Sequence, residues 1–233
     1  MIGERIRHRL ANVIDGWFEY SLYKNIKIAL QKRALESTAE YVYKNMINVN
    51  SCKTRFEVLD KAISSISIEN GLTLEFGVYT GESINYIAKK LPNEKIYGFD
   101  SFEGLPETWR DGIDKNSFQI SGEDLKKLKF LDNVVIVKGY FDETSPTFFK
   151  NTELPIKFMH IDSDLCSSAK TIFDNAGKLI VSGTVMVFDE FFNYPGWEDG
   201  EFKAFSVFVN DNKKEFKFIT YNHKHEQVAI KIL

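Results

Sequence analysis

Residues 72–87, which read LTLEFGVYTGESINYI, constrain the fold of this chain more than any other stretch. An apolar run ends at Phe76, two glycines follow at Gly77 and Gly81, and apolar residues then recur at helical spacing. A strand, a glycine turn and a helix in this order open a doubly wound nucleotide-binding unit. Glycines let the backbone approach a ligand closely, and the unpaired N–H groups of the first helical turn face that ligand.

The spacing of the glycines narrows the choice of ligand. A dinucleotide site uses G-x-G-x-x-G to seat a pyrophosphate, whereas here Val78 and Tyr79 follow Gly77 and position 82 is Glu. The acidic Glu82 would repel a diphosphate, and Gly81 lacks the following Lys-Ser/Thr pair of a Walker loop. S-adenosylmethionine, which carries no phosphate, is therefore the main candidate. A plain tight turn without a ligand is the alternative, because glycine is common at strand-to-helix turns.

The composition excludes several other classes. A chain of 233 residues with 43% hydrophobic residues suits one α/β domain with a full core and a helical appendage. The net charge of −3 argues against nucleic acid as the main partner, which would require a basic face. Cys52 and Cys166 form no C-x-x-C pair, so we expect reduced thiols in a cytoplasmic protein. We find neither the ~20-residue apolar run of a membrane span nor a signal-peptide pattern.

Residues 1–69 are predicted to form a helical region before the domain at 70–233. Within residues 1–36 apolar residues recur every three or four positions, and the opposite face is mildly basic. We expect this helix to pack on the domain or on a second subunit of a homodimer. Peripheral contact with a membrane surface is the alternative. The helical pattern continues through residues 37–69, with an apolar stripe that should cover the sheet.

Strands and helices alternate from residue 70 onward. The predicted strands are 72–76, 95–99, 134–138, 157–161, 184–188, 216–221 and 227–232. The predicted helices are 82–90, 122–129, 167–179 and 200–210. Parallel strands require such crossovers, and seven strands that end in a hairpin, with one late strand antiparallel, are the class I methyltransferase arrangement. We therefore predict an α/β fold with a Rossmann-like seven-stranded sheet and helices on both faces. The long irregular stretch 101–122 is expected to be functional.

In such a sheet the ligand lies beyond the carboxyl ends of the strands. Asp100 stands at the end of the second predicted strand, where a carboxylate accepts hydrogen bonds from two ribose hydroxyls. Capping of a turn is the alternative role for Asp100. His160 lies inside a strand and is expected to be a core or wall residue. The lone histidines His223 and His225 are expected to be solvated unless the sixth strand is parallel and brings them to the ligand edge.

Three carboxylates form a second constellation at this edge. Asp162 follows the fourth strand, and Asp189 and Glu190 follow the fifth. Converging carboxylates repel one another unless they are protonated or bridged by a cation. Oxygen ligands favour Mg²⁺, with Mn²⁺ or Ca²⁺ as alternatives, and no Cys/His cluster suggests zinc. N-capping of the helix that starts near Ser167 is the alternative role for Asp162 and Asp164, and it has more weight for Asp164 than for Asp162. Aromatic residues flank the edge and either line a substrate pocket or pack the loops: Trp109, Phe191, Phe192, Tyr194 and Trp197.

Several linked motifs over about residues 70–200 resemble one known family. LEFGVYTGESI, IYGFDSFEGLPE, VKGYFDETSP, FMHIDSDLCSSAKTIFDN and GTVMVFDEFFNYPGW are similar to the TylF/macrocin O-methyltransferase family of class I enzymes. The resemblance implies S-adenosylmethionine- and Mg²⁺-dependent methylation of sugar hydroxyls, as in macrolide and aminocoumarin glycosides. It places Glu75, Gly77 and Gly81 along the cofactor and Asp100 on the ribose. It also places Ser101 and Phe102 by the adenosine, and the metal on Asp162, Asp189 and Glu190. The family usually has two aspartates where Asp189 and Glu190 stand.

Together these observations predict an O-methyltransferase that acts on a sugar or glycosylated metabolite. Asp162 is the candidate general base, next to the cation. The candidate cofactor contacts are Glu75, Phe76, Gly77, Tyr79, Gly81, Ser83, Asp100, Ser101, Phe102, Gly139, Tyr140 and Asp162. A nicotinamide-dependent oxidoreductase is disfavoured by the missing third glycine. A non-catalytic module that binds cofactor or partner is the third hypothesis. The sequence does not identify the acceptor or its hydroxyl.

Overall fold

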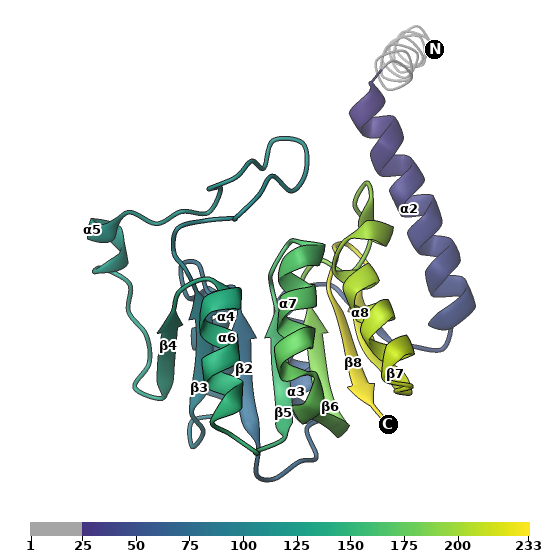
Figure 1. Cartoon of the computed structure of the whole chain (residues 1–233). Helices are drawn as coiled ribbons and strands as arrows, with labels where there is room; N and C mark the ends of the chain where they lie inside the picture. Colours follow the sequence, from purple (N-terminus) through teal and green to yellow (C-terminus); the bar gives the residue numbers. More distant parts are fainter. Residues whose placement is uncertain (1–24) are drawn as a thin grey trace, which may run out of the picture.

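The computed structural model describes residues 25–233, which fold around one eight-stranded sheet (Figure 1). Across the sheet the order is β1-β7-β8-β6-β5-β2-β3-β4. In chain order the strands are β1 (Ser51–Cys52), β2 (Leu72–Phe76), β3 (Ile96–Asp100), β4 (Val134–Lys138), β5 (Ile156–Ile161), β6 (Ile180–Phe188), β7 (Phe216–Asn222) and β8 (Val228–Ile232). Only β8 runs antiparallel to its neighbours β6 and β7, while every other pair is parallel. The predicted late antiparallel strand is thereby confirmed.

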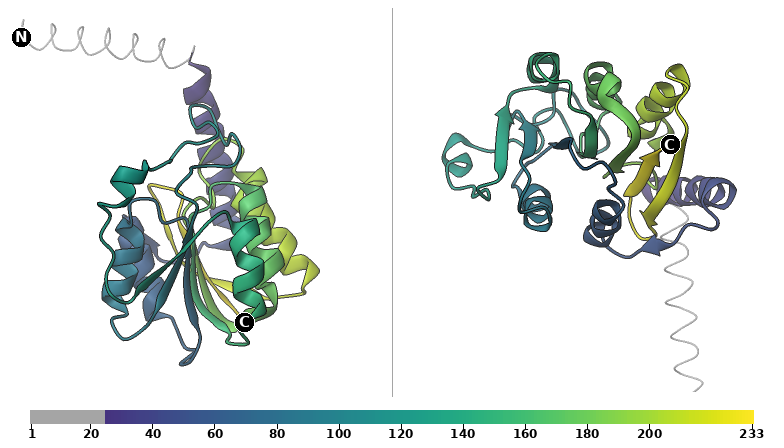
Figure 2. Two further views of the ribbon diagram at one scale, coloured as in Figure 1. Left: turned by 60° about the vertical axis from the view of Figure 1, so that its left-hand side comes forward. Right: turned by 90° about the horizontal axis from the view of Figure 1, so that it is seen from below.

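Helices cover both faces of the sheet, as predicted (Figure 2). One face carries α6 (Phe141–Lys150), α7 (Cys166–Ala176) and α8 (Glu201–Asp211), and the other carries α3 (Arg55–Ser64) and α4 (Glu82–Lys90). The short helices are α5 (Gly122–Leu125), η1 (Gly177–Leu179) and η2 (Trp197–Asp199). Successive strand residues point to opposite faces of the sheet and belong to two apolar cores. Met159 and Met186 pack under α7 and α8, whereas Phe158 and Val185 pack under α3 and α4. This alternation follows from the two-residue side-chain period of a strand.

The strand order places the ligand edge between β2 and β5. From β2 the chain builds outward through β3 and β4 and then crosses to β5 on the other side of β2. The crevice at such a reversal is the usual ligand position in open α/β sheets. In Figure 1 the carboxyl ends of the parallel strands point upward, and the irregular stretch between β3 and α5 arches over them.

The count of seven strands is wrong, because β1 adds an eighth at the β7 edge. Residues 37–69 are therefore not continuously helical: α2 (Ile26–Asn45) ends, β1 pairs with β7, and Thr54 caps a new helix by accepting the N–H of Glu57. Helix α6 was not predicted, because Pro146 lies inside it. The predicted helix over 122–129 ends at Leu125, and β6 starts at Ile180 rather than at residue 184.

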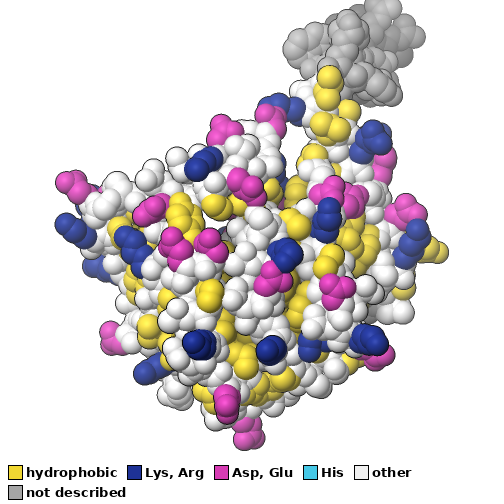
Figure 3. All heavy atoms as spheres, in the orientation of Figure 1, with side chains coloured by type: hydrophobic (Ala, Val, Ile, Leu, Met, Phe, Trp, Pro, Cys, Tyr) yellow, Lys and Arg dark blue, Asp and Glu magenta, His cyan; other side chains and the backbone are white. Residues whose placement is uncertain are grey.

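Helix α2 packs beside the β7 edge. Tyr41 contacts Phe191, Trp197 and Phe202 through edge-to-face aromatic pairs. Other apolar side chains of α2 are exposed, and Figure 3 shows hydrophobic side chains at its surface. The predicted helix over residues 1–36 is helical from Ile26 onward, and the part of that prediction on residues 1–24, with most of its basic face, lies outside the described residues. Over residues 25–233, every helix is too short or too polar to cross a membrane.

Candidate active site

A cavity of about 600 Å³ opens at the carboxyl ends of the parallel strands. The residues after β2, β3, β5 and β6 line its floor, and the stretch 104–113 lines its roof. Among the predicted site residues, those that line the cavity are Gly77, Tyr79, Asp100, Ser101, Tyr140, Asp162, Asp189 and Glu190. The topology thus brings together side chains that lie more than 100 residues apart in the sequence.

The glycine turn after β2 lies against the end of β5. Gly77 has a φ of +89°, and a Cβ at this position would lie 1.8 Å from the carbonyl oxygen of Asp162. Only glycine fits there, because both the backbone conformation and the close approach exclude a side chain. The glycine turn and Asp162 are therefore held at a fixed separation by backbone contact.

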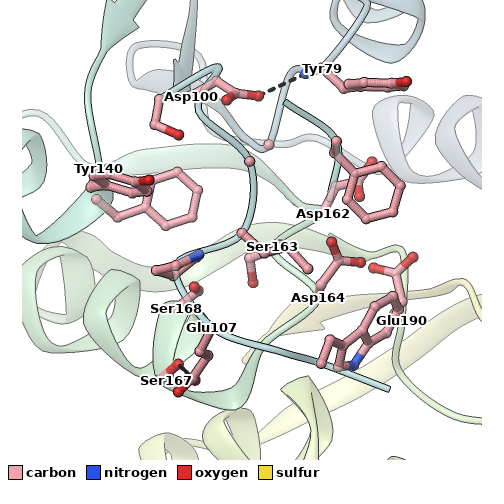
Figure 4. A pocket seen from close by; sticks show the side chains of 18 of the residues that line it. Tyr79, Asp100, Glu107, Tyr140, Asp162, Ser163, Asp164, Ser167, Ser168 and Glu190 are labelled. Atoms are coloured by element: carbon pink, nitrogen blue, oxygen red, sulfur yellow. Dashed lines mark hydrogen bonds between the residues drawn. The ribbon is translucent and has the colours of Figure 1, made fainter. Parts of the chain in front are cut away.

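Asp100 holds the glycine turn in place (Figure 4). Its Oδ2 accepts the N–H groups of Val78 at 2.8 Å and Tyr79 at 2.7 Å, and its Oδ1 accepts the N–H of Phe102 at 2.7 Å. The turn-capping alternative is thus realised in the structure. Asp100 also lines the cavity, and its hydrogen bond to a ribose stays a prediction.

Glu75 and Ser83 lie behind the cavity rather than on its wall. Both are buried, and Ser83 Oγ donates to Glu75 Oε1 at 3.1 Å. His160, fully buried as predicted, donates from Nδ1 to Glu75 Oε2 at 2.9 Å, and its Nε2 lies 3.5 Å from Asp189 Oδ1. Burial disfavours the imidazolium, but Asp189 and Glu75 outweigh it and raise the pKa of His160 to about 10. His160 is therefore a buried cation between two carboxylates.

The remaining predicted cofactor contacts do not reach the cavity wall. They are Phe76, Gly81, Phe102 and Gly139. Phe76 stacks on Phe99 inside the core, and Gly81 caps the N-terminus of α4 with a φ of +85°. Their sequence motif positions the wall residues, and direct cofactor contact by these four or by Glu75 and Ser83 stays a prediction.

The predicted carboxylates do not form one group of three, and Asp164 joins one of the two groups that they do form (Figure 4). Two overlapping groups have ligand atoms within 4.8 Å of one another: His160–Asp162–Asp189 and Asp162–Asp164–Glu190. Asp162 belongs to both, so the predicted trio spans the two groups. The capping alternative for Asp162 and Asp164 is wrong: α7 begins at Cys166 without any side-chain cap, and Asp164 lines the cavity with a φ of +60°. The D-x-D spacing of Asp162 and Asp164 was the signal for this placement.

His160 and Arg55 alone do not keep all of these carboxylates ionised. Burial and the charge of Asp189 raise the pKa of both Asp162 and Glu190, and burial raises the pKa of Asp164 to about 7. Asp189 differs: although burial opposes it, His160 and Arg55 lower its pKa to about 2. Asp189 Oδ1 and Glu190 Oε2 are buried oxygens without a hydrogen-bond partner in the part of the chain that the structure describes. A hard divalent cation fits this oxygen-rich donor set.

Three contributors were missed from the sequence. Arg55, at the start of α3, reaches the carboxylates, with Nη2 3.4 Å from Asp162 Oδ2. Glu201 Oε1 accepts from the Ser163 N–H at 2.9 Å and from its Oγ at 2.8 Å, and burial raises the pKa of Glu201 to about 8. Arg110 lies 3.8 Å from the Trp109 ring centroid and pairs with Glu226 at 3.2 Å. Each comes from an element whose crossing angle or loop path the sequence pattern does not reveal.

The aromatic residues and the late histidines have mixed positions. Trp109 lines the cavity, whereas the aromatics after β6 are buried and pack the loop and core: Phe191, Phe192, Tyr194 and Trp197. Strand β7 is parallel to β6, so His223 and His225 do lie toward the ligand edge. Neither lines the cavity: His223 Nδ1 lies 3.0 Å from Ser51 Oγ, and His225 Nδ1 lies 3.3 Å from Gln227 Nε2.

Residues 74–191, just over half of the chain, match a family described as "Methyltransferase domain". The chain belongs to this methyltransferase family. No curated protein sequence matches it. Among solved structures it is similar to the calicheamicin methyltransferase CalS11, at 21% identity over 76% of this chain and 77% of that chain, with a TM-score of 0.64. The O-methyltransferase NovP gives 18% identity over 76% of each chain and a TM-score of 0.55.

An O-methyltransferase from Bacillus cereus, solved in complex with SAH, covers more of the methyltransferase described here. It is 15% identical over 95% of this chain and 97% of that chain, with a TM-score of 0.53. These three likenesses show that the chain has the class I methyltransferase fold predicted from its strand order. The eighth strand, β1, is an addition to the predicted seven-stranded sheet.

Proposed function

We propose that this methyltransferase is an S-adenosylmethionine-dependent O-methyltransferase of the TylF type, acting on a hydroxyl of a sugar or glycosylated metabolite. One observation carries the proposal: the glycine turn and the carboxylate cluster share one cavity, with Gly77 packed directly on Asp162. A methyl donor seated on the glycine turn would therefore lie next to a proton acceptor. The likeness to CalS11, described as a TDP-rhamnose 3'-O-methyltransferase, supports a sugar hydroxyl as acceptor, and the likeness to the O-methyltransferase NovP supports transfer to oxygen.

The carboxylate cluster fits a divalent cation as part of this proposal. Asp162, Asp189 and Glu190 would hold it. Asp162 and Glu190 share one group of close ligand atoms with Asp164, which would contribute, while Asp189 is grouped with Asp162 and His160. Such an ion, when bound, lowers the pKa of a hydroxyl next to it. The two buried oxygens without hydrogen-bond partners, on Asp189 and Glu190, support the assignment. Mg²⁺ is the first candidate, because all of these donors are carboxylate oxygens.

Asp162 is the candidate general base. Burial and the charge of Asp189 raise its pKa, which makes Asp162 a stronger base than a free carboxylate. Asp162 would take the hydroxyl proton. A bound sulfonium donor would supply the methyl group to the acceptor oxygen, with the carbon–sulfur bond broken and a neutral thioether left, so charge and atoms would balance. The cavity wall around Tyr79, Ser101 and Tyr140 would orient the donor.

Thermal melting tests the cofactor. S-adenosylhomocysteine at ~100 times its Kd should add about 2.7 kcal/mol, a rise of roughly 5–10 °C at this chain length. The melting temperature should be higher with Mg²⁺ present than with EDTA present. A rise with NAD⁺ alone would favour an oxidoreductase, and no rise with either ligand would favour a non-catalytic module.

Replacement of the base tests the chemistry. Asp162→Ala should abolish methyl transfer to a sugar acceptor and leave S-adenosylhomocysteine binding within about threefold, because Asp162 contributes its backbone carbonyl, not its carboxylate, to the glycine turn. Isothermal titration measures the binding. Loss of cofactor affinity together with activity would contradict the role given to Asp162.

A further inference from the structure

Arg55 contributes the only arginine or lysine side chain that pairs with Asp162 or Asp189 within residues 25–233. Thr54 caps α3 and so fixes the backbone at Arg55, whose side chain then extends to the ligand edge. Its Nη2 lies 3.4 Å from Asp162 Oδ2 and its Nε lies 3.8 Å from Asp189 Oδ1. Arg55 also lines the cavity, and its side chain is 31% exposed.

These contacts are loose for an arginine ion pair. Charge-assisted N–H···O bonds are usually 2.7–2.9 Å long, and a settled arginine–carboxylate pair is often bidentate. Here both distances are longer, and among residues 25–233 neither Arg55 Nε nor Asp189 Oδ1, both buried, has a hydrogen-bond partner. The guanidinium therefore makes one long hydrogen bond, from Nη2 to Asp162 Oδ2 at 3.4 Å, and leaves its Nε and the Asp189 oxygen unsatisfied, which is the geometry of a counter-ion that can leave.

The position of Arg55 overlaps the proposed cation site. Asp162 and Asp189 are two of the three proposed ligands, and both point an oxygen at the guanidinium. A guanidinium and a divalent cation on the same two carboxylates would repel each other strongly at such short range. The partial exposure of Arg55 gives its side chain room to swing into the cavity.

We propose that Arg55 is a displaceable resident counter-ion of this site: it neutralises Asp162 and Asp189 when no metal is bound, and a divalent cation binds by displacing it. This inference rests on the proposed function, because it assumes the cation site of that proposal. Arg55 is thus a positioning residue that lowers metal affinity and keeps the metal-free carboxylates folded together. Arg55 is the first residue of α3, so metal binding depends on a helix from the face of the sheet that is opposite to α6, α7 and α8.

Binding of Mn²⁺ to the full chain, without substrate, tests the inference. The signal of unbound Mn²⁺ in electron paramagnetic resonance measures affinity for the wild type, Arg55→Gln, Arg55→Lys and Lys61→Gln. Arg55→Gln should bind Mn²⁺ about tenfold more tightly or better, because a unit charge a few ångström away is removed. Arg55→Lys keeps the charge and should stay within about threefold of the wild type. Lys61→Gln removes a charge from the exposed last turn of the same helix and should change nothing.

Two results would overturn the inference: Mn²⁺ affinity in Arg55→Gln that is equal to or weaker than in the wild type, or an equal gain in Lys61→Gln. Melting adds a signature that a merely structural role would not give. Arg55→Gln should melt below the wild type in EDTA and yet gain more from Mn²⁺. A lower melting temperature under both conditions, without the larger gain, would contradict displacement.

A measurement on the wild type covers the case in which Arg55→Gln does not fold. Modification by phenylglyoxal, followed by mass spectrometry, reports the accessibility of Arg55. Mn²⁺ should speed the modification of Arg55 relative to EDTA, and protection by Mn²⁺ would overturn the inference. Binding of S-adenosylhomocysteine in EDTA separates the two proposals. If the cofactor binds but neither wild type nor Arg55→Gln binds Mn²⁺, the Arg55 inference fails while the methyltransferase assignment stands.

Discussion

At the scale of single residues, the contact between Gly77 and Asp162 is the least tolerant point of the site. Gly77→Ala places a methyl group 1.8 Å from a backbone oxygen that can move only with β5, on a φ of +89°. Backbone strain alone costs about 1–3 kcal/mol, and the collision adds to it, so we expect a loss of roughly 3 kcal/mol or more in unfolding free energy. Urea unfolding monitored by circular dichroism measures the loss.

Gly112→Ala is the matched control for this prediction. Gly112 has a similar φ of +83°, but nothing lies within 4 Å of its added Cβ. This variant should lose only the strain component, about 1–2 kcal/mol. Equal losses in the two variants would show that the close approach to Asp162 contributes nothing.

Glu201 gives a prediction about pH. Burial raises its pKa to about 8 although Ser163 donates to it, whereas the unfolded carboxyl titrates near 4.5. The folded form therefore holds a proton that the unfolded form releases, so the stabilising contribution is complete below about pH 4.5 and is lost as the pH rises towards about 8. Glu201→Gln mimics the protonated acid, and its melting temperature should fall less than that of the wild type between pH 5.5 and 8. Calorimetric scans at the two pH values check this. An equal fall in melting temperature in Glu201→Gln and in the wild type would contradict a protonated Glu201.

At the scale of elements, the stretch between β3 and α5 is held over the cavity by side-chain contacts. Arg110 pairs with Glu226 and stacks on Trp109, and Glu107 accepts a hydrogen bond from Ser167 at 2.5 Å. Arg110→Ala removes both the pair and the stack, so amide exchange in residues 104–117 should speed up by about tenfold. The melting temperature should fall by no more than roughly 3 °C, because partly exposed pairs contribute little to global stability.

Asp111→Asn is the control for this stretch. Its ion pair with Lys27 joins the same stretch to α2, but the two side chains are 71% and 78% exposed. The pair should be nearly neutral in free energy, so exchange in residues 104–117 should stay unchanged. Hydrogen exchange read by mass spectrometry compares the two variants, and equal effects would assign the ordering of the stretch to something other than Arg110.

The sequence predicts the bounds of an element correctly where the residues of that element and its ends carry the whole signal. Strand β2, helix α4 and strand β4 have the predicted bounds, because an apolar run, a glycine turn and a proline mark their ends. The two-residue β1 is too short to show any alternation, and it exists only because β7 offers it an edge.

The same distinction holds within the candidate site. Asp162, Asp189 and Glu190 were predictable, because parallel strands deliver their carboxyl ends to one edge. The role of Arg55 was not predictable, because its contact with the carboxylates depends on where α3 crosses its face of the sheet, the face opposite to α6, α7 and α8. The capping alternative for Asp164 is wrong: a carboxylate just before a helix usually caps it, whereas here the chain turns through a left-handed conformation first.

At the scale of the whole molecule, the contacts of α3 with the sheet bear on the predicted domain boundary between residues 69 and 70. Helix α3 belongs to residues 1–69, yet its Val58, Leu59 and Ala62 are fully buried in the core shared with β5, β6 and β8. Burial of a Val or Leu side chain contributes about 1.5–3 kcal/mol, while a whole domain is stable by only about 5–15 kcal/mol. A chain of residues 70–233 should therefore fail to fold, because it exposes this face of the sheet and loses Arg55.

A chain of residues 50–233 is the matched control. It lacks α2 but keeps β1 and α3, so it should fold with a lower melting temperature and still bind S-adenosylhomocysteine. Circular dichroism, size-exclusion chromatography and ligand-induced melting compare the two chains. A cooperative transition in the 70–233 chain would restore the boundary at residue 70 and make α3 an accessory helix. If the 70–233 chain fails to fold while the 50–233 chain folds, α3 belongs to the catalytic unit. This is the place that the role proposed for Arg55 requires.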